Sequence, residues 1–133
     1  MSITKHYVTF LSPGTFLHEE STKEIPEWNV EAATTMAREI TARYNATPFA
    51  FQFSTRERGD GDFDSKQTKK SGRYFLGGKI ETVADVEARN DPDERILLSN
   101  MKRNGWDRIV VNTNSFMITQ PLNADDTVLE YAV

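Results

Sequence analysis

The densest mixture of groups suited to nucleotide recognition lies between Asn100 and Arg108 and continues to Thr113. Arginine binds phosphate as a bidentate fork, asparagine matches the donor–acceptor edge of a base, and an aromatic ring stacks on the base. We therefore predict Asn100, Arg108 and Thr113 as ligand-binding residues. The alternative is structural: Asn104 and Gly105 end a helix, and the adjacent tryptophan anchors the core.

A second set of cations flanks the charged stretch 56–72, which holds nine charged residues and three glycines. This composition predicts one long loop. Unstructured loops of this length are uncommon inside compact domains and are usually functional or disordered. Arg56, Arg58 and Arg73 would lie near one another if paired strands hold its two ends. Arg56 and Tyr74, the aromatic residue next to Arg73, are predicted ligand contacts. Ordinary surface arginines are the alternative.

Three carboxylates in this stretch, Asp60, Asp62 and Asp64, alternate as they do in a calcium loop. The pattern fails in detail, because Ser65 stands where such a loop needs glycine and Ser71 stands where it needs a bidentate glutamate. We predict no metal site.

Catalytic motifs are absent from the sequence. It has no cysteine, no nucleophile elbow, no phosphate-binding glycine loop and no dinucleotide fingerprint. His6 and His18 are its only histidines. We predict no catalytic residues and no cofactor, and a small hydrolase or nucleotide-modifying enzyme that relies on one of these histidines is an alternative.

Composition sets the class of protein. With 133 residues and a net charge of −4, the chain is expected to form one domain with one core. Dispersed basic residues and a net negative charge argue against binding to duplex nucleic acid. No apolar run reaches the length of a membrane span or a signal peptide, which predicts a soluble cytoplasmic protein.

Hydrophobic periodicity predicts an α+β fold with a largely antiparallel sheet and two main helices packed on one face. The helices are expected at 29–45, capped by Asn29 and Asn45, and from Asp91 to Arg103. A capping box at 82–85 predicts a short third helix. Expected strands cover residues 7–11, 15–20, 49–53, 74–76, 109–111, 116–118 and 127–131.

Three runs carry a resemblance to a known group of proteins: Tyr7-Val8-Thr9-Phe10-Leu11-Ser12-Pro13-Gly14-Thr15-Phe16, Glu87-Ala88-Arg89-Asn90-Asp91-Pro92, and Ser99-Asn100-Met101 through Asn104-Gly105-Trp106-Asp107-Arg108. They resemble a widespread group of small phage and prophage proteins, and the likeness covers most of the chain. That group is similar to the phage anti-Thoeris sponges, which sequester a cyclic ADP-ribose-type signal made by a bacterial immune sensor.

The resemblance implies an anti-defence protein of the host bacterial cytoplasm that binds a small nucleotide signal without cleaving it. It also implies a homo-oligomer with pockets between protomers. Asn90 and Arg108 lie in the matching runs and are predicted ligand contacts. An inhibitor that binds a host protein directly, through an exposed patch such as the acidic residues 60–64, is an alternative.

Overall fold

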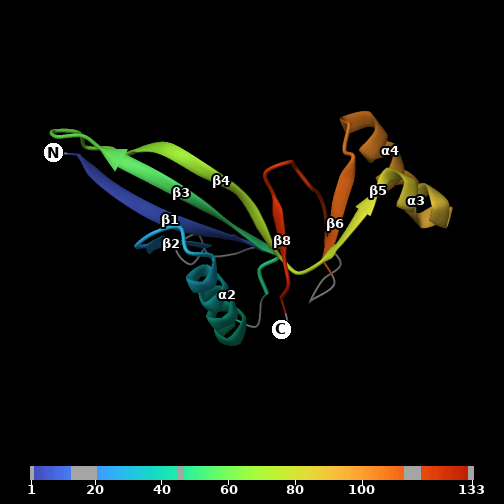
Figure 1. Cartoon of the computed structure of the whole chain (residues 1–133), viewed down its shortest axis with the longest axis horizontal. Helices are drawn as coiled ribbons and strands as arrows, with labels where there is room; N and C mark the ends of the chain where they lie inside the picture. The colour runs from blue at the N-terminus through green and yellow to red at the C-terminus, as the bar shows by residue number, and fades with distance from the viewer. Residues whose placement is uncertain (1, 13–20, 45–46, 113–117, 132–133) are drawn as a thin grey trace.

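The α+β class is confirmed, but the strands form two sheets where the sequence predicts one (Figure 1). The large sheet has the strand order β2-β1-β3-β4-β8, and the small sheet has the order β5-β6-β7. Among the described strands, all neighbours pair antiparallel except β4 and β8, which are parallel. The computed structural model describes residues 2–12, 21–44, 47–112 and 118–131.

The strands and helices have the following bounds. The large sheet contains Ile3–Leu11 (β1), Thr22–Ile25 (β2), Ala50–Arg58 (β3), Lys66–Leu76 (β4) and Thr127–Leu129 (β8). The small sheet contains Lys79–Thr82 (β5), Arg108–Asn112 (β6) and Ile118–Pro121 (β7). The helices are Val30–Tyr44 (α2), Val83–Arg89 (α3) and Arg95–Asn104 (α4), and a 3₁₀ turn spans Pro92–Glu94. The predicted extended segment 15–20 and the predicted helix end at Asn45 lie outside the described residues.

Helix α2 covers one face of the large sheet and forms the main core with it (Figure 1). The predicted cap is confirmed, since the side chain of Asn29 accepts a hydrogen bond from the backbone N–H of Ala32 at 3.0 Å. The buried core residues shared by the helix and this face are Val8, Phe10, Ile25, Ala33, Ala37, Ile40, Phe51, Phe53 and Leu76. The opposite face of the large sheet carries no helix among the described elements.

The predicted long loop at 56–72 is wrong. Strand β3 runs to Arg58 and β4 begins at Lys66, so the connecting loop is only residues 59–65. The first half of β4 has no apolar alternation because residues 66–70 are all exposed. Lysines on such an exposed strand edge oppose pairing with other chains. The charge that suggested a loop therefore belongs to the half of β4 that pairs only with β3, because β8 pairs with β4 only at 74–76.

The small sheet packs against α3 and α4 through a core of Val86, Met101 and Ile109. The two main predicted helices therefore cover two different sheets. The capping box is confirmed, because the Thr82 side chain accepts from the backbone of Asp85 and the Asp85 side chain accepts from that of Thr82. The strand predicted at 109–111 is confirmed as β6, which pairs antiparallel with β7, and β7 begins at Ile118, the last residue of the strand predicted at 116–118.

The two sheets meet at a second apolar cluster, in which Ala50 and Phe75 of the large sheet pack with Val110 of the small one. No helix formed by the described residues is both long and apolar enough to cross a bilayer.

A buried ion pair reinforces this junction. Arg73 on β4 pairs with Asp126, which precedes β8, at 2.9 Å, and also donates to the carbonyl of Pro121 on β7. Gly72 permits the approach, because a Cβ there would collide with the backbone carbonyl of Asp125.

Candidate functional site

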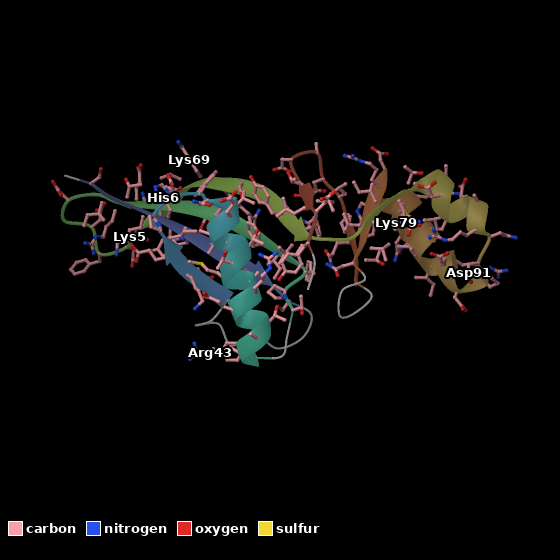
Figure 2. The ribbon with its side chains drawn as sticks, turned by 60° about the horizontal axis from the view of Figure 1, so that its bottom comes forward. Lys5, His6, Arg43, Lys69, Lys79 and Asp91 are labelled. Carbon is pink, nitrogen blue, oxygen red and sulfur yellow. The ribbon has the colours of Figure 1, made fainter. Side chains whose placement is uncertain are left out.

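The predicted ligand contacts lie toward opposite ends of the molecule. Arg56 sits on the part of β3 that pairs with Lys5, whereas Asn90 directly precedes Asp91 at the end of α3. Figure 2 shows Lys5 at one end and Asp91 at the other. One small molecule therefore cannot contact both Arg56 and Asn90 of a single chain. Thr113 lies outside the described residues.

Tyr74 has a packing role in the core. Its ring stacks on Phe51 with 5.3 Å between ring centroids and meets Phe53 edge-on at 5.6 Å. Both phenylalanine rings are fully buried beneath α2. Tyr74 thus extends the aromatic core rather than presenting a free ring face.

Asn90 is explained by the backbone. It ends α3 in the left-handed conformation, with φ 48° and ψ 41°, which asparagine tolerates better than most residues. The hollow beside it is lined by three carboxylates, from Glu87, Asp91 and Glu94, as well as by two cations. These surroundings suit a phosphate poorly.

Arg89, in the same matching run, was missed by the sequence reasoning. It forms ion pairs with Glu81 on β5 and with Glu94 in the turn before α4. Hydrogen bonds to Glu94 and Glu81 raise the pKa of Arg89 above its usual value, and the bond from Arg89 lowers the pKa of Glu94. This network joins β5, α3 and the turn before α4. Only the fold brings the three residues together, so the sequence carried no signal for it.

The two remaining contacts predicted in this part of the chain are Asn100 and Arg108. Asn100 is half-buried on α4, and Arg108 begins β6 with an exposed side chain. Arg108 has no ion-pair partner among the residues that the structure describes. It stays a predicted ligand contact without a formed cluster around it.

A group of cations does converge at the other end of the molecule. A hollow of about 190 Å³, here called the cationic pocket, opens on the far end of the large sheet. Its lining contains three cations and two aromatic rings, and no carboxylate. The lining residues are Ile3, Lys5, Tyr7, Arg56, Arg58, Phe63 and Ser65.

Strand register places these cations on one face. In the β1–β3 pair, Lys5 lies opposite Arg56 and Ile3 lies opposite Arg58. Directly opposed residues share a face, and successive residues along a strand alternate between faces. Val8, at an even position of β1, is buried beneath α2. Lys5, at an odd position of β1, therefore points to the face of the large sheet opposite α2.

The loop 59–65 completes the pocket because Arg56 holds it down. The Arg56 guanidinium donates to the hydroxyl of Ser65 and to its carbonyl, both at 2.8 Å. Lys5 and Arg58 are then the other two cations of the lining. The pair between Lys5 and Glu24, at 3.7 Å and half-exposed, is weak and leaves the ammonium available.

Sequence reasoning found part of this pocket. Arg56 and Arg58 lie together as expected, but Arg73 does not join them because it is bound to Asp126 at the junction. Lys5 and Phe63 were missed as site residues. The two arginines on either side of Glu57 were the available signal in one segment, but only the pairing of β1 with β3 shows that Lys5 lies beside them.

Histidine and carboxylate chemistry has little support in the described part of the chain. His6 Nδ1 lies 2.8 Å from the hydroxyl of Thr55, on the side of the sheet opposite Lys5. His18 lies outside the described residues. Within the described ranges, no three histidine, aspartate or glutamate side chains are grouped so as to hold a metal ion.

No protein-family model, curated protein or solved structure matches this chain. The functional argument therefore rests on the geometry of the cationic pocket.

Proposed function

We propose that the protein binds a small anionic, nucleotide-like molecule in the cationic pocket and holds it without cleaving it. The observation that carries this proposal is the convergence of Lys5, Arg56 and Arg58 with two aromatic rings around one hollow. The chain as a whole is acidic, with a net charge of −4, so a pocket whose charged lining residues are all cations runs against its average composition.

The chemistry of the lining matches the parts of a nucleotide. The Arg58 guanidinium can bind a phosphate as a planar fork, and the Lys5 ammonium adds a point charge beside it. Tyr7 and Phe63 offer ring surfaces for a base. Arg56 acts mainly through the loop that it anchors, and its role is to position the pocket.

Within this class, we propose a cyclic ADP-ribose-type immune signal as the ligand. Two phosphates and an adenine require cations and aromatic surface together, which the cationic pocket supplies. The resemblance to phage anti-Thoeris sponges supports the same class. The protein would act in the host bacterial cytoplasm, where it lowers the free signal concentration below the level that the immune effector needs.

The pocket also favours self-association. Pockets for drug-sized ligands usually have volumes of about 300–1,000 Å³, whereas the cationic pocket has about 190 Å³ and is open to solvent. A second copy would supply the missing wall and complete the site. Light scattering at micromolar concentration in the presence of ligand is expected to give at least a dimer mass, and a monomer mass would contradict this expectation.

Sequestration is distinguished from catalysis by recovering the ligand. Cyclic ADP-ribose is incubated with the protein, unbound ligand is removed by filtration, and the protein is denatured by heat. We expect chemically intact ligand to be released in stoichiometric amount. A chemically altered product would instead indicate an enzyme, and an absence of uptake would contradict the proposal.

A direct inhibitor of a host protein is the second candidate, and one observation favours it. The tip of the β3–β4 hairpin presents a phenyl ring, Phe63, that is 97% exposed between exposed carboxylates at positions 62 and 64. Aromatic rings ringed by charge are common at protein interfaces. An absence of nucleotide uptake in the experiment above would favour this candidate.

A further inference from the structure

Phe63 is placed where it contributes nothing to the core. Its ring is 97% exposed, although it is a large apolar side chain. A phenyl ring loses most of its potential hydrophobic stabilisation in water, so folding alone does not account for its presence at this position. The same ring lines the cationic pocket next to Lys5 and Arg58.

The loop holds Phe63 in place from both sides. Before it, the backbone N–H of Asp62 donates to the carbonyl of Gly59 at 3.1 Å and closes a tight turn. After it, Ser65 is bound by the Arg56 guanidinium through two hydrogen bonds. The backbone on both sides of Phe63 is therefore held by hydrogen bonds, and its side chain lines the mouth of the pocket.

From this arrangement we infer that Phe63 is the specificity-determining residue of the cationic pocket and selects phosphates that carry a planar aromatic ring. This inference rests on the proposed function and deepens it. Lys5 and Arg58 attract the phosphate, and Phe63 covers the attached base by stacking on it. A phosphate without a base gains nothing from the phenyl ring.

Two commercial probes separate these roles. Adenosine diphosphate carries both a diphosphate and a base, whereas inorganic pyrophosphate carries only the charge. Calorimetry on the full chain is expected to give tighter binding for adenosine diphosphate. In Phe63→Ala its affinity should fall about tenfold or more, which is the usual effect of removing a base-stacking ring, while pyrophosphate affinity stays unchanged.

Two further variants guard this interpretation. Phe63→Trp should bind adenosine diphosphate at least as tightly as the unaltered protein, in contrast to Phe63→Ala, because indole offers a larger stacking surface. Ile96→Ala is the matched control: this side chain is 77% exposed on α4, in the small-sheet part of the fold, so its loss should leave both affinities unchanged. Circular dichroism checks that each variant folds.

The two possible failures are distinguishable. If the unaltered protein binds neither probe, the proposed function is overturned and this inference falls with it. If it binds both probes and Phe63→Ala leaves adenosine diphosphate affinity unchanged, this inference alone is overturned. An equal loss for both probes would likewise overturn it, because the ring would then serve the pocket's shape and not the base.

Discussion

Replacing Asp126 with alanine is expected to lower the free energy of unfolding by about 3 kcal/mol, the order of loss when a buried ion pair loses one partner. The Asp126 side chain is only 2% exposed and accepts hydrogen bonds from Arg73 and from the backbone N–H of Asn123. Its removal strands the Arg73 guanidinium, which is 17% exposed, at the junction of the two sheets. Urea unfolding followed by circular dichroism measures the loss.

The matched control for this variant is Asp107→Ala, which removes an exposed carboxylate between α4 and β6. Its effect should stay below about 0.5 kcal/mol, as for ordinary surface substitutions. Equal stability of the Asp126→Ala variant and the unaltered protein would show that apolar packing alone holds the junction.

The effect of Asp126→Ala should depend on pH in one direction. Burial alone would raise the pKa of Asp126, but hydrogen bonds from the Arg73 side chain and backbone outweigh burial and hold the pKa below its usual value. The stabilisation is therefore fully present above the unfolded pKa of about 4 and is lost as pH falls through the lower folded value. The stability difference between the two proteins should stay constant from pH 7 to pH 5 and shrink only in more acidic solution. A difference that shrinks as pH rises would contradict this assignment.

Arg58→Ala is expected to weaken binding of adenosine diphosphate by about ten- to a hundredfold. A charge-assisted contact from a guanidinium to phosphate contributes roughly 1.5–3 kcal/mol. Arg58→Lys should recover little, because an ammonium lacks the planar fork. Since Arg58 is exposed at the end of β3, its loss should leave the free energy of unfolding unchanged. Calorimetric titration and urea unfolding of the same samples separate the two effects.

Arg108→Ala is the control for that experiment. It also removes one exposed arginine, but from the small sheet, away from the cationic pocket. If the cationic pocket alone binds the ligand, the affinity of this variant should match that of the unaltered protein. If instead Arg108→Ala lost affinity and Arg58→Ala did not, the ligand would bind at the end of the molecule predicted from the sequence resemblance, and the assignment of the cationic pocket would be wrong.

Local features of the fold were predictable because local signals specify them. Apolar spacing predicted α2, and the side chains of Asn29 and Thr82 predicted helix starts that the structure confirms. Asp91 caps a 3₁₀ turn instead, and α4 begins after that turn, at Arg95. Gly105 ends α4 in the left-handed conformation, as its position after the last helical residues indicated.

Features that depend on distant partners were not predictable in the same way. The first half of β4 was missed because both of its faces are exposed there, which removes the apolar alternation that marks a strand. The division into two sheets was missed because β5 pairs with β6 instead of β4, while β8 returns to pair in parallel with β4, some fifty residues earlier. No local pattern encodes that return.

The candidate site also combines residues that local patterns predict with a residue that only the fold brings in. Arg56 and Arg58 are two residues apart on one strand, so their shared face follows from alternation alone. Lys5 joins them only through the register of β1 against β3, which is a pairing of segments about fifty residues apart. The pocket therefore could not be predicted without the pairing of β1 with β3.

The most direct test of the central claim is a calorimetric titration of cyclic ADP-ribose into the unaltered protein and into a Lys5→Ala, Arg58→Ala double variant. If the cationic pocket binds anionic nucleotides, the unaltered protein should give a saturable binding isotherm. The double variant, with an unchanged circular dichroism spectrum, should bind at least a hundredfold more weakly. Equal binding by both proteins, or no binding by the unaltered protein, would contradict the account.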